Sequence, residues 1–150
     1  MELDNPTPID SQVVACGPLT DADRDLIAAA TEVVDRCSDG ANHTVAAAVR
    51  DASGRIHTGV NVFHFTGGPC AELVVLGVAR AAGAGELESI VAVGDEDRGV
   101  LSPCGRCRQV LADLHGGLRV ILPTGGALAA VSAVDLLPFR YEQTYERRLR

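Results

Sequence analysis

The chain has 150 residues, 47% of them hydrophobic, which is enough apolar material for one ordinary domain with a packed core. Its 20 acidic and 13 basic side chains give a net charge of −7, and only 3% of the residues are aromatic. The chain therefore lacks the basic surface and the stacking platform that nucleic-acid-binding proteins use. No apolar run reaches the roughly 18 to 20 residues of a membrane span, and no basic region followed by an apolar run opens the chain.

The five cysteines are an odd number, which does not suit a disulfide framework and indicates reduced thiols. Reduced thiols lead us to expect a cytoplasmic protein. From the acidic charge, the scarcity of aromatic residues and the lack of a long apolar run, we expect it to act on a small molecule and to have neither nucleic acid nor a membrane as its partner. Residues 1–19 contain three prolines and show no hydrophobic period, so we expect an irregular N-terminal arm. Residues 20–150 are expected to form a single domain.

The first predicted element is a helix that begins after Thr20, whose hydroxyl can cap it, with Asp21 and Asp23 near the positive end of the helix dipole. Gly40 is predicted to end this helix. Its apolar residues recur at a spacing of 3.6. They are Leu26, Ile27, Ala30, Val33, Val34 and Cys37.

Predicted strands and helices then alternate. The residue types and turn signals predict strands at residues 44–49, 56–62, 87–94, 118–122 and 127–131. Two further helices are expected at 70–82 and 103–115, each opened by a proline, Pro69 or Pro103. The first of these is apolar on all sides and is therefore expected to be buried on several sides. Alternating strands and helices indicate an α/β layered domain.

Two short segments carry the chemistry: Pro69-Cys70-Ala71-Glu72, and Pro103-Cys104-Gly105-Arg106-Cys107. Each proline places a thiol at a helix start, where free backbone N–H groups favour the thiolate. Cys104 and Cys107 are three residues apart and share one helix face. We therefore predict that Cys70, Cys104 and Cys107 bind one Zn²⁺, with the fourth position left to a water, as in catalytic zinc sites.

Three thiolates leave such a site with a formal charge of −1, which Arg106 and the helix dipoles could offset. Glu72 lies two residues after the first ligand and is predicted to move protons instead of binding the metal. This pattern is typical of zinc deaminases, in which hydroxide attacks the ring carbon and the glutamate is the general acid and base. Glu72 is thus the predicted catalytic residue.

These motifs resemble those of the cytidine deaminase family, and the similarity runs from about Thr44 to Tyr141. The resemblance implies a three-layer α/β/α domain with a five-stranded mixed sheet, one zinc per subunit and a homotetramer. Residues 59–77 and 97–111 are most similar to the blasticidin-S deaminase branch of that family. Ordinary cytidine deaminases carry Asn-x-Glu to grip a ribose hydroxyl, whereas Asn61 is followed here by Val62 and Phe63.

The resemblance also implies substrate contacts from Thr44, Asn61, Arg98 and Tyr141. Thr44 stands where the blasticidin enzyme has a serine. Arg98 could pair with a substrate carboxylate through two hydrogen bonds. The expected activity is hydrolytic deamination of the cytosine ring in a nucleoside-type compound of the blasticidin-S type, with a role in antibiotic resistance.

Three alternatives remain open. The first is a cytidine or deoxycytidine deaminase of pyrimidine salvage, against which Phe63 speaks. The second is a non-catalytic zinc protein, in which His64 or His115 would be a fourth ligand that closes the site. The third is a thiol–disulfide enzyme that uses Cys104 and Cys107, which would leave Glu72 without a role.

Overall fold

The structure is a computed structural model, and it describes residues 15–142. The elements follow in the order β1 (Cys16–Gly17), α1 (Asp21–Cys37), β2 (Val45–Asp51), β3 (Ile56–Val60), α2 (Ala71–Ala81), β4 (Leu87–Gly94), β5 (Gly99–Leu101), α3 (Gly105–Leu114), β6 (Arg119–Pro123), β7 (Leu128–Ser132) and the 3-10 helix η1 (Ala133–Leu136). Within the described part of the chain, no helix is both long and apolar enough to cross a membrane.

One mixed sheet forms the centre of the molecule, with the strand order β1-β7-β6-β4-β2-β3 and with β5 paired to β4. β4 and β6 run parallel, and the other pairs are antiparallel. The five expected strands correspond to β2, β3, β4, β6 and β7. The additional strands, β1 and β5, are two and three residues long. So short a strand shows no period in the sequence and depends on a neighbouring strand for its hydrogen bonds.

The expectation of a wholly irregular segment before residue 20 was therefore wrong at Cys16 and Gly17. These two residues pair with Val131 and Ala130 at the edge of the sheet. Residues 1–14 of the expected arm, and the charged tail from residue 143 on, lie outside the described residues.

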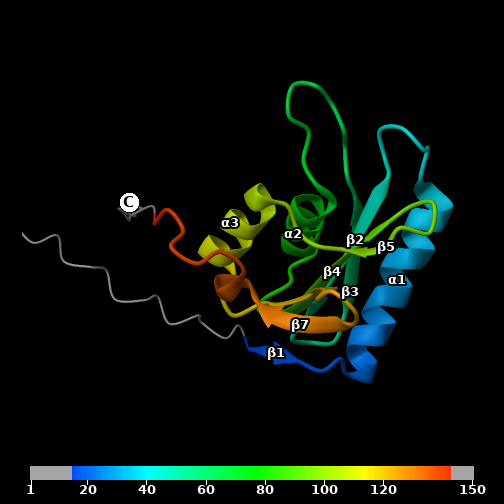
Figure 1. The fold of residues 1–150 in the computed structure, drawn as a ribbon. Helices are drawn as coiled ribbons and strands as arrows, with labels where there is room; N and C mark the ends of the chain where they lie inside the picture. The colour runs from blue at the N-terminus through cyan, green and yellow to red at the C-terminus, as the bar shows by residue number, and fades with distance from the viewer. Residues whose placement is uncertain (1–14, 143–150) are drawn as a thin grey trace, which may run out of the picture.

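Helices cover both faces of the sheet, so the three-layer α/β/α expectation is confirmed. Figure 1 shows α1 on one side of the sheet and α2 and α3 on the other. The alternation of side chains along β2 explains this arrangement. Ala46 and Ala48 pack with the α1 side, whereas Ala47 and Val49 pack with the α2 and α3 side. These small side chains let the helices approach the sheet closely.

Helix α1 begins where the sequence predicts. Thr20 and Asp23 form a capping box, in which each side chain accepts a hydrogen bond from the other's backbone N–H. The buried Asp23 carboxylate also accepts two hydrogen bonds from Arg119 at the start of β6, at 2.8 and 3.2 Å. The helix ends at Cys37, before Gly40, which lies in the following turn with a φ of 67°.

Helices α2 and α3 differ from expectation in two ways. Each begins directly after a cysteine, so Cys70 and Cys104 are the N-cap residues, and Pro69 and Pro103 precede the caps instead of opening the helices. α2 is buried on one face and not on several sides. Val78 on its outer face is 41% exposed, because the described chain supplies no element to cover it. The outer face of α2 is thus apolar and open.

Candidate functional site

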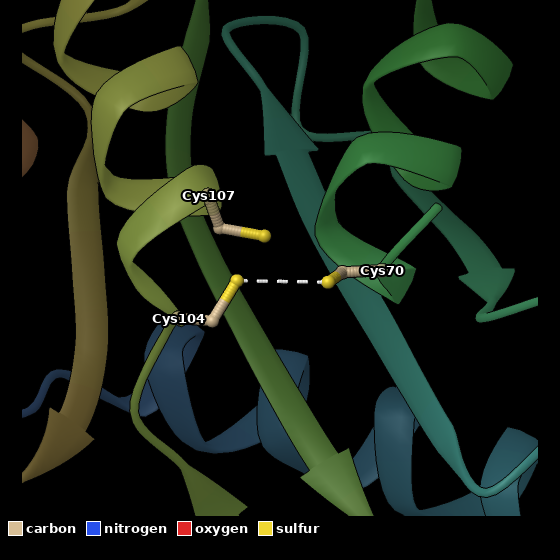
Figure 2. A group of neighbouring side chains, drawn as sticks. All are labelled: Cys70, Cys104 and Cys107. Carbon is tan, nitrogen blue, oxygen red and sulfur yellow. Dashed lines mark hydrogen bonds between the residues drawn. The ribbon is translucent and has the colours of Figure 1, made fainter. Parts of the chain in front are cut away.

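Three thiols meet between the N-termini of α2 and α3. Cys70 and Cys104 are the N-cap residues of α2 and α3, and Cys107 lies on the first turn of α3. Their sulfur atoms all lie within 4.8 Å of one another, and the sulfurs of Cys70 and Cys104 are 3.6 Å apart. Figure 2 shows the three side chains pointing into the same space between the two helices. The three predicted ligands are therefore brought together.

The backbone around Cys104 favours negative charge on its thiol. Neither cysteine N-cap uses its side chain to cap its helix, so the sulfurs are available to a metal. Burial alone would raise the pKa of Cys104, but backbone N–H groups of Cys107 and Arg106 and the neighbouring thiols lower it below its ordinary value. Burial, together with the charge of Glu72, raises the pKa of Cys107. A cation is what would allow all three to ionise together.

Arg106 supplies a positive charge beside the cluster. Its guanidinium donates hydrogen bonds to the carbonyl of Gly68 at 2.8 Å and to the sulfur of Cys70 at 3.7 Å. The contact with Cys70 and the charges of the other thiols raise the pKa of Arg106. The contact between Arg106 and the sulfur of Cys70 therefore supports the prediction that Arg106 offsets the negative charge of the thiolates.

Glu72 lies on the first turn of α2 and is only 6% exposed. Burial raises the pKa of its carboxyl group, while its own backbone N–H and a hydrogen bond with Cys107 partly oppose this effect. A carboxyl group with a raised pKa takes up and releases a proton more readily near neutral pH. This property suits a residue that serves first as a base and then as an acid.

A cavity of about 210 Å³ opens beside the thiols, and its surface is mainly apolar. Its lining consists of Val45, Asn61, Val62, Phe63, Gly68, Pro69, Cys70, Ala71, Glu72, Ala92, Leu101, Ser102 and Cys104. Glu72 and two of the thiols thus face the same space. Gly68 is required in this wall, because a Cβ atom there would lie 1.7 Å from the carbonyl oxygen of Val62.

Of the four predicted substrate contacts, Asn61 is the one that lines this cavity. Its side-chain oxygen accepts hydrogen bonds from the backbone N–H groups of Thr44 and Val45, at 2.8 and 2.9 Å. Its amide nitrogen donates a longer bond of 3.3 Å to the carbonyl of Asn42. The amide N–H₂ group is therefore the part of Asn61 that is left for a ligand. Thr44 adjoins the cavity without lining it.

Arg98 is held away from the cavity by the described chain itself. Its guanidinium donates to the carboxylate of Asp95 at 2.5 Å and to the carbonyl of Thr44 at 2.6 Å. Arg98 also lies against Gly94, where a Cβ atom would approach its guanidinium to 2.9 Å. The arginine therefore fastens the β4–β5 turn to the start of β2 in this structure.

Tyr141 is not brought to the site. Its side chain is 74% exposed, and its backbone carbonyl accepts a hydrogen bond from Gln109 on α3 at 2.9 Å. Among the residues that the structure describes, no histidine joins the three thiols. His64 instead contacts Thr66 within its own loop, at 2.6 Å.

Sequence reasoning missed part of the cavity wall. Val45, Leu101 and Ser102 were not singled out, although each directly adjoins a residue or segment that was. Phe63 was noted only for the acid that it replaces, yet it lines the cavity. Apolar wall residues belong to no motif. The sequence could have indicated them only through their nearness to Thr44 or Cys104.

The donor set fits zinc. Three sulfurs bound to Zn²⁺ at about 2.3 Å in tetrahedral geometry lie roughly 3.8 Å apart. The observed distance of 3.6 Å between Cys70 and Cys104, and the 4.8 Å limit for the whole cluster, agree with this spacing. The three-thiol cluster therefore fits one zinc per chain.

Comparison with known proteins supports the same assignment. Residues 20–122 match the family described as the cytidine and deoxycytidylate deaminase zinc-binding region. Blasticidin-S deaminase from Bacillus cereus is 32% identical over 132 residues, which are 82% of this chain and 94% of that protein. Cytidine deaminase from Mycobacterium tuberculosis is 41% identical over 80 residues, which are 52% of this chain and 59% of that protein.

The fold has a close counterpart among solved structures. The crystal structure of cytidine deaminase from Burkholderia pseudomallei superposes with a TM-score of 0.65 at 34% sequence identity. The match covers 79% of this chain and 98% of that chain. It therefore extends over nearly the whole of the solved protein.

Proposed function

We propose, since the chain belongs to the cytidine and deoxycytidylate deaminase family, that it converts the cytosine ring of a nucleoside-type small molecule to uracil and releases ammonia. The chain is a zinc-dependent hydrolytic deaminase by family. One structural observation supports this reaction at this particular site. Cys70, Cys104 and the buried Glu72 face one small apolar cavity, and Cys107 completes the thiol cluster beside it, which suits the attack of water on a bound ring.

Different residues of the site have different roles in this reaction. Cys70, Cys104 and Cys107 would hold the zinc. When bound, zinc lowers the pKa of a coordinated water so that hydroxide is available near neutral pH. Arg106 balances the charge of the thiolates through its contact with Cys70. The apolar cavity wall excludes bulk water from the ring.

Glu72 moves the protons. Its carboxylate takes a proton from the attacking water and delivers it to ring N3 while the C4–O bond forms. The carboxylate then takes the proton of the new C4 hydroxyl group and gives it to the amine, so that the C4–N4 bond breaks, the C4 carbonyl forms and ammonia leaves. The burial of Glu72 raises its pKa and so lets one group serve in both directions.

We propose a blasticidin-S-type compound as the substrate. The relative of that name matches this chain over 94% of its own length. Phe63 lines the cavity where the ordinary family pattern has an acid for a ribose hydroxyl, so the wall offers an aromatic face instead of a carboxylate. The alternative is cytidine or deoxycytidine, which the relative from Mycobacterium tuberculosis supports over a shorter stretch.

Substrate contacts from Thr44, Asn61, Arg98 and Tyr141 remain part of this proposal. Asn61 would use its amide N–H₂ group. Arg98 would have to exchange its bond with Asp95 for one with a substrate carboxylate. Tyr141 would reach a cavity only through assembly of several copies, because it does not line its own.

Assembly, location and role complete the proposal. The open apolar face of α2, with Val78 41% exposed, supports a homotetramer in which other copies cover it. The two core clusters, one on each face of a single sheet, support one domain from residue 20 on, and the pairing of Cys16 and Gly17 with β7 adds two earlier residues to it. A cytoplasmic enzyme that inactivates an antibiotic is the role we assign.

The test is an ultraviolet deamination assay of zinc-loaded protein on blasticidin S, with cytidine in parallel. Turnover of blasticidin S well above that of cytidine supports the proposed substrate. Turnover of cytidine alone would replace it with the salvage alternative. Failure on both compounds, with zinc bound, would overturn the proposed function.

A further inference from the structure

A network of hydrogen bonds behind the cavity leads to an acidic residue outside it. Asp39 lies in the turn after α1, is exposed, and does not line the cavity. Its Oδ1 atom accepts three hydrogen bonds, from the backbone N–H groups of Ala41, Asn42 and His43, at 2.8 to 2.9 Å. One carboxylate oxygen therefore organises the whole turn at residues 39–43.

The turn holds the cavity wall through its backbone. The carbonyl of Asn42 accepts a hydrogen bond from the backbone N–H of Phe63 at 2.8 Å and one from the Asn61 amide at 3.3 Å. The ring of His43 bonds the carbonyl of Asn61 through Nδ1 at 2.7 Å. A carbonyl oxygen only accepts, so Nδ1 carries the proton. In Figure 1 the two connecting segments, after α1 and after β3, stand together at one end of the molecule.

We propose that Asp39 is a positioning residue that sets the cavity wall formed by Asn61 and Phe63. The inference rests on the proposed function, since it concerns the same site. Asp39 acts through the turn, and the turn acts on both wall residues. The thiols and Glu72 lie at the starts of α2 and α3 instead, and within the described residues none of them has a hydrogen bond to this turn.

Because the turn supports the cavity wall whereas α2 and α3 carry the thiols and Glu72, loss of the Asp39 carboxylate is predicted to affect KM much more than kcat. Without the three bonds to Asp39, the turn loosens and the substrate meets a less ordered wall, whereas the proton-transfer group stays in place. Asp39→Ala is therefore expected to raise KM by roughly three- to tenfold while kcat stays within about twofold. The N–H groups of His43 and Ala41 lower the pKa of Asp39, so its carboxylate is ionised throughout a neutral assay.

Two variants serve as matched controls. Asp39→Asn keeps an oxygen acceptor in the same position and is expected to restore most of the wild-type KM. Asn42→Ala removes a side chain from the same turn but keeps the backbone carbonyl that bonds Phe63, so its KM is expected to match the wild type. His43→Phe breaks the bond to Asn61 without touching Asp39, and its KM is expected to rise.

The experiment combines steady-state kinetics on blasticidin S and cytidine with amide hydrogen exchange of each zinc-loaded variant. In Asp39→Ala, exchange at Phe63 is expected to quicken roughly tenfold, while exchange in α2 and α3 is unchanged. Unchanged exchange at Phe63 would overturn the inference and leave the proposed function intact. So would quicker exchange with an unchanged KM, or a fall in kcat alone. If Asp39→Ala does not fold, Asp39→Glu, which shifts the carboxylate oxygen by one methylene group relative to the three N–H groups, decides by the same criteria.

The two failures are distinguishable. A wild-type protein that deaminates neither compound refutes the proposed function, and with it the assigned positioning role. A wild-type protein that is active, with Asp39→Ala equal to it in KM, refutes only the role of Asp39.

Discussion

The guanidinium of Arg106 lies 3.7 Å from the sulfur of Cys70 and so joins the N-terminus of α3 to that of α2. The same guanidinium bonds the carbonyl of Gly68 in the loop that leads to Cys70. One side chain therefore ties the cavity loop and the thiol cluster together. Its charge offsets that of the three sulfurs.

Removal of this charge should affect activity more than zinc content. We expect Arg106→Ala to lower kcat by roughly 10- to 100-fold, since residues that support metal ligands have effects of that size. More negative charge at the thiolates makes a bound metal a weaker acid. Zinc content, measured by atomic absorption, should remain near one per chain. Arg106→Lys should recover part of the activity, and an unimpaired Arg106→Ala enzyme would contradict the charge-balancing role.

Glu72→Gln tests the proton transfer. The amide has the shape of the carboxyl group but cannot exchange protons, so kcat should fall by roughly 100-fold or more. Zinc should be retained, because the three thiols form the ligand cluster without Glu72. Glu88→Gln, on the exposed start of β4, is the matched control and should keep full activity. Near wild-type turnover by Glu72→Gln would rule out the assigned role.

Cys104→Ser tests the link between zinc and folding. Loss of one thiol should release zinc, because a hydroxyl is a much poorer ligand for this metal. A ligand present at 100 times its Kd stabilises the folded state by about 2.7 kcal/mol, so the free energy of unfolding should fall by about that amount. Cys37→Ser replaces an exposed thiol that lies outside the cluster and should change neither property. Urea unfolding with zinc analysis measures both, and a zinc-replete Cys104→Ser protein would contradict the ligand assignment.

The pair between Asp23 and Arg119 should make stability depend on pH. Burial alone would raise the pKa of Asp23, but the bonds from Thr20 and Arg119 lower it below its ordinary value of 3.8. Stability from this group is therefore complete above pH 3.8 and is lost as the pH falls toward the lower, folded-state pKa. At pH 7, Arg119→Ala should cost about 1 to 2 kcal/mol, because it leaves a buried carboxylate less well bonded.

The difference between wild type and Arg119→Ala should then shrink below pH 3.8, as Asp23 becomes protonated in both proteins. Urea unfolding at a series of pH values measures this difference. Arg24→Ala, at an exposed ion pair of the same helix, should show a much smaller effect at every pH. A constant difference down to low pH would mean that the ion pair does not account for the stability.

The sequence alone determined the local features of this protein. The capping box at Thr20 and Asp23 and the boundaries of β4 follow from short-range hydrogen bonding and side-chain period, which neighbouring residues settle among themselves. The thiol cluster could also be predicted, because Cys104 and Cys107 share a helix face by spacing alone. Cys70 was predicted as the third ligand because a catalytic zinc site has three protein ligands and because the motif resembles that of the deaminase family.

Tertiary structure decided what depends on segments distant in the sequence. The pairing of Cys16 and Gly17 with β7, the bond from Arg106 to Cys70 and the bond from Arg98 to the carbonyl of Thr44 have no local pattern. The cavity wall is of the same kind, since its apolar residues come from five separate segments of the chain. Such contacts form only when the helices pack on the sheet and bring distant segments of the chain together. No period or motif in the sequence indicates them.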